Sequence, residues 1–287
     1  MKNKLNELRR MLEDLNADGI CAAFSGGVDS TLLLTVLSEL YARKPFPLLA
    51  VVFATAFHTA EETASAMQLA EELGVPAELV KRDVLSDPVL RENPKDRCYH
   101  CKRGLFSEMR RIAEEHGIKR LVDGTNADDT QTYRPGRKAL EELGVLSPLA
   151  LCGFSKEEIR AAARELLIPV ADKPSTPCLA TRFPYGTIMT DEALRRVERG
   201  EAVLREFGMR VVRLRLHGDV ARIETDPEGF ELASAKRFEI AFALRQEGFP
   251  YVSLDLEGFR SGSMDEPLPM KKCPRIPGKK NGGESGI

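Results

Sequence analysis

The sequence predicts an α/β fold, in which a doubly wound, mostly parallel sheet is followed by a smaller α+β C-terminal domain. Three short apolar runs, 20–24, 48–53 and 77–82, alternate with longer segments of helical spacing, as expected when helices cover both faces of a parallel sheet. The run 48–53 is apolar throughout, which is typical of a strand buried on both faces. After about residue 187 the order changes to helix, two strands, helix and strand, which indicates a second domain.

Helices are expected between these strands. The first opens the chain, because leucines recur at helical spacing, at Leu5, Leu8, Leu12 and Leu15. A second begins near Thr31, and a third covers about 60–73, where Gly74 ends it. A fourth helix is expected from about 104 to 116, and a strand over 120–123 follows it.

A domain boundary is expected near 183–186, which reads Phe-Pro-Tyr-Gly. Before it, Ser155 and Glu158 form the capping box of a further helix. We therefore predict three segments, which are a larger domain over 1–183, an α+β domain over 187–260, and a disordered tail, rich in Gly, Lys and Pro, over 270–287.

Composition excludes several classes of protein. The 287 residues are 43% hydrophobic, enough for a substantial core, and the net charge of −2 gives no general attraction to nucleic acid. No apolar run reaches 18 residues, so we expect no membrane span. Six cysteines are too sparse for the disulfide framework of a secreted protein. These features favour a cytoplasmic protein.

The stretch between the first strand and its helix has the features of a phosphate site. It consists of Ser25, Gly26, Gly27, Val28, Asp29 and Ser30. A helix N-terminus presents unpaired N–H groups and the positive end of its dipole, and glycines allow the backbone to approach a phosphate closely. The serines can donate their hydroxyls, and Asp29 can hold Mg²⁺ on the phosphates of ATP. The simpler alternative is an ordinary turn that happens to contain glycines.

Two other strand ends are expected at the same edge of the sheet. Phe53, Ala54 and Thr55 end the second strand, where a purine ring can stack or form hydrogen bonds. Gly124 opens the loop after a later strand and is expected to face the nucleotide. Arg134 is a candidate clamp for a phosphate or a carboxylate, since a guanidinium fork matches either. A surface ion pair is an equally good interpretation of Arg134.

Three cysteines stand out by their positions. Cys98 and Cys101 form a C-x-x-C pair in a polar loop, and Cys178 lies in a proline-rich loop. Taken alone, the pair also fits a redox dithiol or half of a zinc site, with His100 as a further ligand. The other cysteines are expected to be core residues at positions 21 and 152 and to have no fixed role at 273.

The stretch from Ser25 to Ser30 resembles the SGGxDS motif of the PP-loop ATP pyrophosphatases, which have the fold of the adenine-nucleotide alpha hydrolases. It is not a Walker motif, because no Gly-Lys-Ser/Thr follows. Over almost its whole length the chain looks like the LarE family of ATP-dependent sulfur transferases. The matching segments are 25–30, 123–129, 133–136, 173–182 and 211–224. The string 174–182 narrows the resemblance to this family.

The resemblance implies an enzyme that uses ATP and Mg²⁺ on a small nucleotide, pyridinium-3,5-biscarboxylic acid mononucleotide. Enzymes of this superfamily cut ATP between the α and β phosphates and use AMP to activate a carboxylate. A sulfur nucleophile would then displace AMP and leave a thiocarboxylate, a step toward the nickel-pincer cofactor of lactate racemase. The family also implies homo-oligomers and an indirect link to the maturation proteins of the racemase. It implies no membrane partner.

The resemblance leaves two sources for the sulfur. In one branch of the family, the cysteine that matches Cys178 is consumed and becomes dehydroalanine. In the other, three cysteines hold a [4Fe-4S] cluster whose fourth iron can carry an extra sulfide. Because Cys98 and Cys101 are present beside Cys178, the sequence favours the cluster over both the sacrificial cysteine and a zinc site.

The second domain offers candidates for binding the substrate. Arg213 and Arg215 alternate along a strand and so face the same side. They resemble an arginine pair that binds substrate phosphate in the family, although a solvated sheet face also fits their spacing. Arg182 is a further candidate for the substrate. Glu224 matches a position near a metal or substrate site, and this assignment is the weakest.

Two other functions remain open at this point. A PP-loop tRNA thiolase pairs the same ATP motif with three cysteines, but the chain lacks a basic RNA domain and only its tail is notably basic. A non-catalytic module that binds a nucleotide or a cluster is the second alternative. Such a module needs neither an intact Asp29 nor a placed thiolate, which argues against it.

Overall fold

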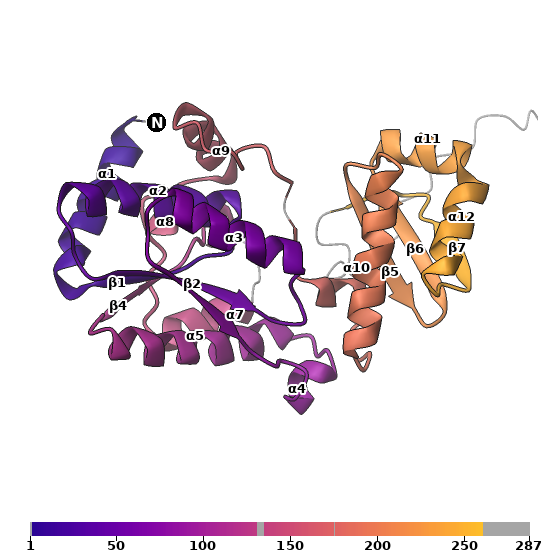
Figure 1. Ribbon diagram of the computed structural model, residues 1–287, viewed down its shortest axis with the longest axis horizontal. Coiled ribbons are helices and arrows are strands. Elements are labelled where there is room, and N and C mark those ends of the chain that lie inside the picture. The colour runs from indigo at the N-terminus through magenta and orange to yellow at the C-terminus, as the bar shows by residue number, and fades with distance from the viewer. Residues whose placement is uncertain (1, 131–134, 175, 261–287) are drawn as a thin grey trace, which may run out of the picture.

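The computed structural model describes residues 2–130, 135–174 and 176–260 (Figure 1). It confirms the α/β class, with four parallel strands in the order β3-β2-β1-β4. These strands are β1 (Ile20–Ala23), β2 (Leu48–Ala54), β3 (Ala77–Lys81) and β4 (Arg120–Val122). Because all four run in one direction, their carboxyl ends meet at one edge of the sheet.

Helices cover both faces of this sheet, so the doubly wound arrangement is confirmed (Figure 1). One face carries α1 (Lys2–Leu15), α2 (Val28–Arg43), α3 (Ala60–Glu72), α8 (Pro148–Leu151) and α9 (Lys156–Glu165). The other face carries α5 (Arg97–Glu115) and α7 (Pro135–Glu142). Two shorter helices, α4 (Pro88–Arg91) and α6 (Ala127–Thr130), follow the ends of β3 and β4, and a 3-10 turn, η1 (Asn16–Asp18), leads into β1.

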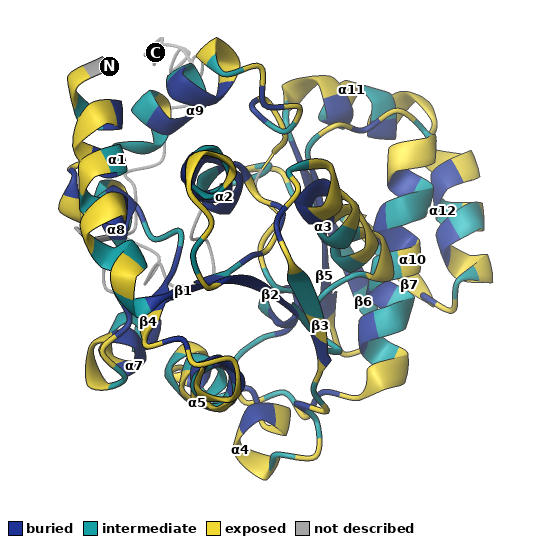
Figure 2. Cartoon of the chain, turned by 60° about the vertical axis from the view of Figure 1, so that its left-hand side comes forward, coloured by how far each residue is buried: buried dark blue, intermediate teal, exposed yellow. Residues whose placement is uncertain are grey.

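The centre of the sheet is the buried part of this domain, since β1 and most of β2 are dark blue in Figure 2 while the edge strand β3 is largely teal. The central strand β1 pairs with β2 on one side and β4 on the other, and Ile20 and Cys21 within it are fully buried. Helix α2 is also buried over most of its length, because it lies between the sheet and α1, α8 and α9. This burial fixes the N-terminus of α2 at the carboxyl edge of the sheet.

The second domain is a three-stranded sheet with helices. The sheet has the order β5-β6-β7, antiparallel between the first two strands and parallel between the last two. Its elements are α10 (Asp191–Glu206), β5 (Val212–His217), β6 (Val220–Thr225), α11 (Pro227–Ala235), α12 (Arg237–Gln246) and β7 (Tyr251–Leu254). Gly200 lets α10 approach the sheet, since a Cβ there would collide with the side chain of Leu214 in β5.

The two domains share one hydrophobic cluster at their junction. Phe57, Val84 and Leu90 of the first domain pack into the same cluster as residues of α10, β5 and β6. The connecting segment contains a 3-10 turn, η2 (Leu179–Arg182), and the boundary predicted near 183–186 falls between η2 and α10. The limits 1–183 and 187–260 stay predictions, and the tail over 270–287 lies outside the described residues.

Two element predictions were wrong. The fourth helix begins at Arg97, not near 104, so the C-x-x-C pair lies on a helix and not in a loop. Long-range contacts support this start, because the side-chain amide of Asn93 donates to the carbonyls of Phe183 and Pro184 at 3.1 and 2.9 Å. In the second domain, the single helix expected after β6 is divided into α11 and α12 at Lys236.

Candidate functional site

Residues 25–30, here called the phosphate loop, connect β1 to α2 at the carboxyl edge of the sheet. Gly26 has a φ of +67°, and a Cβ at this position would lie 3.2 Å from the Cα of Ala66 in α3. Both facts require glycine here. Gly27 is the N-cap of α2, and the first helical hydrogen bond runs from the Thr31 N–H to its carbonyl at 2.9 Å. The preceding N–H groups therefore lie at an open helix N-terminus.

Two serine hydroxyls hold the phosphate loop in shape. The Oγ atoms of Ser25 and Ser30 lie 3.2 Å apart, and Ser30 Oγ donates to the carbonyl of Gly27 at 3.1 Å. The Ser25 hydroxyl also accepts from the Gly27 N–H at 3.4 Å. Val28 is buried and anchors the first turn of α2 in the core. This arrangement presents backbone N–H groups and hydroxyls to an anion at one point.

Asp29 faces a lysine that the sequence analysis missed. Lys156, the first residue of α9, places its Nζ 2.7 and 2.8 Å from the two carboxylate oxygens of Asp29. The side-chain amide of Asn126 donates to the same carboxylate at 3.4 Å. The backbone N–H of Lys156 donates to Asp128 at 2.8 Å, which fixes the start of α9 beside the phosphate loop. The only signal in the sequence was the capping box immediately before this lysine.

The loop after β4 packs directly on the phosphate loop. A Cβ on Gly124 would lie 2.9 Å from the backbone nitrogen of Ser30, so only glycine allows this approach. The neighbouring Asp123 is buried and accepts from the hydroxyls of Thr125 and Ser147 at 2.5 and 2.6 Å. Lys102 of α5 reaches this carboxylate with its Nζ at 3.7 Å. Lys102 thus connects the helix that carries Cys101 to the edge of the nucleotide site.

The predicted purine site lies at the end of β2. Phe53 and Ala54 are its last two residues and are partly buried. The hydroxyl of Thr55 lies 3.1 Å from Nδ1 of His58 and accepts from the Phe57 N–H at 3.1 Å. Burial lowers the pKa of His58, so a neutral imidazole is favoured beside this site. No contact here tests the role in binding a purine, which stays a prediction.

The three predicted cysteines share one environment. Cys98 and Cys101 lie one turn apart at the start of α5, and Cys178 immediately precedes η2. Burial raises the pKa of Cys101 to about 12, with smaller contributions from the charges of Cys178 and Cys98, while Arg97 and Arg82 oppose the rise. Burial also raises the pKa of Cys178, and Arg97 again opposes it. Cys101 and Cys178 both pack against the hydrophobic cluster that the two domains share, so helix α5 and the segment of Cys178 meet in this region.

The described residues offer no site for a single metal ion at the cysteines. Within them, no group of three or more His, Cys, Asp or Glu side chains is close enough to hold one metal ion. The His100 ring is directed to Asp96, with Nε2 3.1 Å from its carboxylate. A cubane cluster binds each cysteine through a different iron, so its three thiols surround a larger space. A cluster held by Cys98, Cys101 and Cys178 stays a prediction.

The segment that carries Cys178 is fastened by a buried arginine. Arg182 is fully buried, and its Nε and Nη2 lie 2.7 and 3.0 Å from the two carboxylate oxygens of Glu201 in α10. Its Nη1 donates to the carbonyl of Pro177 at 2.9 Å. The N–H of Leu179 donates to the carbonyl of Phe57 at 3.0 Å. The described contacts of Arg182 are all with protein groups, and its contact with the substrate stays a prediction.

Arg213 and Arg215 lie on β5 and are 8% and 5% exposed, so the alternative of a solvated sheet face is wrong. Arg215 forms two hydrogen bonds to Glu224 of β6, at 3.1 and 3.0 Å, and also donates to the carbonyl of Thr181. Arg213 lies over the ring of Phe259, 5.2 Å from its centre, and burial lowers its pKa to about 10. Arg213 therefore remains cationic at neutral pH, and Arg215 lies against the segment that carries Cys178.

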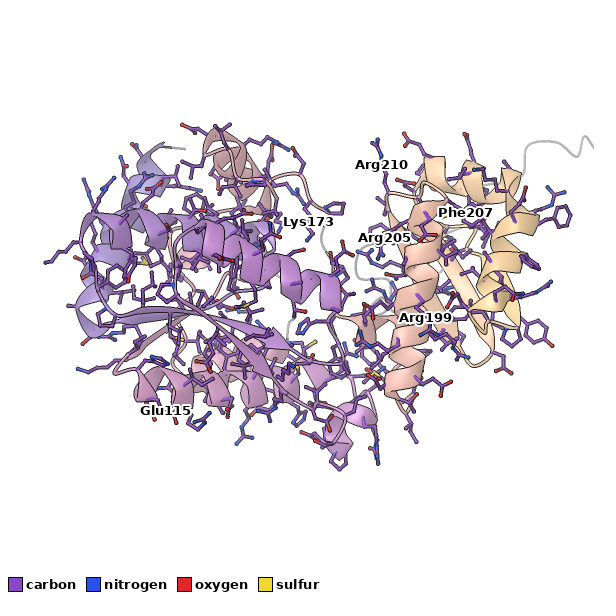
Figure 3. The ribbon with its side chains drawn as sticks, in the orientation of Figure 1. Glu115, Lys173, Arg199, Arg205, Phe207 and Arg210 are labelled. Atoms are coloured by element: carbon purple, nitrogen blue, oxygen red, sulfur yellow. The ribbon has the colours of Figure 1, made fainter. Side chains whose placement is uncertain are left out.

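Another arginine of α10 borders the same region. Arg205 lies on the side of α10 that faces the first domain, as Figure 3 shows, and its Nη2 is 3.2 Å from Glu201. The sequence analysis did not select Arg205 or Glu201, because neither belongs to a recognisable motif. Arg134, the predicted clamp, lies outside the described residues.

Comparisons with known proteins extend over the whole chain. A family model described as a PP-loop domain matches residues 1–131. The chain is 38% identical over 257 residues to the pyridinium-3,5-bisthiocarboxylic acid mononucleotide synthase of Lactiplantibacillus plantarum, which covers 90% of this chain and 92% of that protein. It is 38% identical to the uncharacterized protein slr1717 of Synechocystis sp., over 93% of this chain and 99% of that protein.

An archaeal relative is more distant. The uncharacterized protein MJ0830 of Methanocaldococcus jannaschii is 31% identical over 259 residues, which are 90% of this chain and 98% of that protein. The similarity thus includes the second domain as well as the phosphate loop. None of the described helices is long and apolar enough to cross a membrane.

Proposed function

Since the chain belongs to the LarE family, which includes the synthase of L. plantarum, we propose that it is an ATP-dependent sulfur transferase of nickel-pincer cofactor synthesis. In the proposed reaction, a carboxylate of pyridinium-3,5-biscarboxylic acid mononucleotide attacks the α-phosphorus of ATP, and pyrophosphate leaves. Sulfide then attacks the activated acyl carbon, and AMP leaves. In the sacrificial route the Cys178 thiolate attacks instead and forms a thioester, and β-elimination then breaks the Cβ–S bond, so that the sulfur stays on the product and dehydroalanine on the protein. The product is a thiocarboxylate for the cofactor of lactate racemase.

The observation that carries this proposal is the continuity of contacts between the phosphate loop and the cysteines. Gly124 packs against Ser30, and Asp123 next to it faces Lys102 at 3.7 Å. Lys102 follows Cys101 directly in the sequence. An acyl group activated over the phosphate loop would therefore lie only a few side chains from the thiols. Neither a tRNA site nor a purely binding role is needed to explain this arrangement.

The phosphate loop would bind the triphosphate through the N-terminus of α2 and the hydroxyls of Ser25 and Ser30. Asp29 provides the carboxylate oxygens that Mg²⁺ prefers. When bound, Mg²⁺ would neutralise charge on the phosphates and on departing pyrophosphate. Lys156 holds Asp29 at 2.7 Å, and it would move toward the phosphates once the nucleotide enters. Asp29 would then be available to the metal.

Cys98, Cys101 and Cys178 would hold a [4Fe-4S] cluster, whose fourth iron supplies a place for the sulfide that is transferred. Cys101 and Cys178 are partly buried against the shared hydrophobic cluster, whereas Cys98 is exposed. Arg97, with Nη2 4.0 Å from Cys98 Sγ, adds positive charge to this group. The alternative within the same function is a sacrificial Cys178.

The substrate phosphate would bind near Arg213 and Arg215. The two buried arginines carry positive charge, and Arg215 pairs with Glu224 through its Nη2 at 3.0 Å. Arg215 also contacts the carbonyl of Thr181, so a phosphate bound at this pair would be close to the segment that carries Cys178. Arg182 is assigned the task of holding that segment.

The test is an anaerobic incubation of the purified chain with ATP, Mg²⁺ and the mononucleotide, followed by mass spectrometry of product and protein. We expect pyrophosphate release that depends on the mononucleotide, a product in which sulfur replaces oxygen, and about four irons per chain. A colourless protein whose Cys178 becomes dehydroalanine would show that the sulfur comes from the sacrificial cysteine and not from a cluster. Release that requires tRNA, or no release at all, would refute the proposed function.

A further inference from the structure

An open pocket of about 440 Å³ lies on the outer side of α5, away from the phosphate loop. It lies between the end of β3, the start of α4 and the exposed face of α5. Figure 2 shows this exposed face of α5 in yellow. The charged or titratable groups that line it are Arg82, Asp87, His100, Arg103, Glu108 and Arg111. The three arginines outnumber the two carboxylates, so the pocket is cationic even when its histidine is neutral.

Arg82 is fixed on the surface of α5 by a glycine. Its Nη1 donates to the carbonyl of Gly104 at 2.7 Å. A Cβ on Gly104 would lie 2.8 Å from Nη2 of Arg82, so the guanidinium can lie flat on the helix only because position 104 is glycine. One hydrogen bond leaves other N–H donors of this guanidinium for a ligand. One side of the pocket is thus formed by the guanidinium of Arg82, whose orientation is fixed before a ligand binds.

Arg103 is the second cation, and it differs from its neighbour Arg111. Arg111 is held by two carboxylates, with Nη2 2.7 Å from Glu108 and Nη1 bonded to Glu115, which Figure 3 labels near the end of α5. Arg103 is exposed, and its side chain forms no hydrogen bond or ion pair with any residue that the structure describes. Its five donors are therefore open to a ligand in the pocket.

The acidic groups at the pocket are occupied. Glu108 pairs with Arg111, as described above, and Asp87 caps α4 by accepting from the Val89 N–H at 2.9 Å. His100 pairs with Asp96, just outside the pocket. Two guanidinium groups that line the pocket keep N–H donors for a ligand, Arg82 with one described hydrogen bond and Arg103 with none in the described part of the chain. Two guanidinium forks match the oxygens of a tetrahedral anion.

We propose that this pocket binds a small tetrahedral dianion through Arg82 and Arg103. Two sources share this chemistry, which are a phosphate ester and thiosulfate. The pocket adjoins the turn of α5 that carries Cys101, because Gly104 lies on the next turn of the same helix. Thiosulfate would therefore be a sulfur-bearing ligand near the cysteines, whereas a phosphate ester would be a regulatory ligand. The proposal does not depend on the proposed function.

The test uses the full chain at constant ionic strength, and each titration is repeated with Gly26→Ala, in which anion binding at the phosphate loop is weakened. Inorganic phosphate and thiosulfate are titrated separately, and the amide resonances of residues 104 and 107 are followed by NMR. We expect saturable shifts with at least one probe. Phosphate alone would assign the site to phosphate esters, thiosulfate alone to a sulfur compound, and both to tetrahedral dianions in general.

Two variants make the test specific. Arg103→Ala should weaken binding about tenfold or more, because it removes an unpaired guanidinium. Arg111→Ala removes the same charge from the same helix and should change binding by about twofold or less, since its guanidinium is already paired. Equal losses of anion affinity in the two variants would mean that the anion responds only to the total charge of the helix, and this result would overturn the proposal. The absence of saturable shifts with either probe would overturn it as well.

A third variant keeps the proposal testable if an alanine substitution alters the fold. Arg82→Lys retains the positive charge but loses the planar fork, and it should weaken binding about fivefold or more. Circular dichroism of each variant would confirm that the helices are retained. An unchanged anion affinity in a folded Arg82→Lys protein would show that the planar guanidinium of Arg82 does not contribute to the site.

Discussion

The two halves of the candidate site are built in different ways. The phosphate loop is a single stretch of six residues, and its geometry depends on backbone groups and on the absence of Cβ atoms at Gly26 and Gly124. The sulfur half collects Cys98, Cys101 and Cys178 from distant segments. Its geometry depends on side chains, above all on buried ion pairs. One half is therefore sensitive to small steric changes, and the other to the loss of a single charged partner.

The largest expected effect comes from a substitution that disrupts the sulfur half of the site. Arg182→Met should destabilise the protein by about 3–5 kcal/mol, because it removes the buried guanidinium that pairs with both carboxylate oxygens of Glu201. Burial alone would raise the pKa of Glu201, but the hydrogen bonds and charge of Arg182 together lower it, so the carboxylate is ionised. Thermal and urea unfolding would measure the loss. ATP binding by the folded fraction should be retained.

Two controls accompany this variant. Arg164→Met breaks an exposed pair, in which Nη2 lies 2.7 Å from Asp172, and should have little effect on stability. The double variant Arg182→Met/Glu201→Gln should recover part of the loss, because no unpaired charge remains buried. Wild-type stability in Arg182→Met alone would show that this pair does not hold the segment of Cys178.

The second largest effect is expected from a substitution that disrupts the phosphate half of the site. Gly26→Ala should weaken ATP binding about thirtyfold, roughly 2 kcal/mol, because the new Cβ meets α3 at 3.2 Å and the positive φ disfavours any residue with a side chain. Gly74→Ala is the matched control, since Gly74 has a φ of +66° but no atom within 4 Å of its ideal Cβ. Calorimetry with ATP should show a loss in the first variant only. Similar losses in both would mean that general strain, and not the site, is responsible.

The same difference explains what the sequence could and could not predict. The phosphate loop was predicted because its six residues are contiguous and each has a local physical role. Lys156 was missed, because its contact with Asp29 depends on how α9 packs beside α2. Glu201 was missed for the same reason, as its partner lies in another segment. The loop predicted around Cys98 proved to be a helix, because long-range contacts of Asn93 support its start.

The third expected effect concerns the link between the halves. Arg213→Ala should raise the KM for the mononucleotide about tenfold, roughly 1.4 kcal/mol, and leave ATP binding unchanged. The reason is that the arginine belongs to the proposed phosphate site of the substrate and has no described contact with the phosphate loop. Arg237→Ala is the control, because Arg237 also lies over an aromatic ring, that of Phe238, but on an exposed face. An unchanged KM in Arg213→Ala would remove this residue from the substrate site.

The smallest expected effect concerns Lys156. Lys156→Gln should weaken ATP binding about fivefold at saturating Mg²⁺, roughly 1 kcal/mol, if the lysine moves from Asp29 to the phosphates. Lys4→Gln removes the same charge near α9, where Lys4 pairs with Glu158 at 2.6 Å, and should leave ATP binding unchanged. If Lys156 serves only as the partner of Asp29, the substitution should not weaken ATP binding. Its removal would then free the carboxylate, so ATP affinity would be kept and the Mg²⁺ requirement would fall.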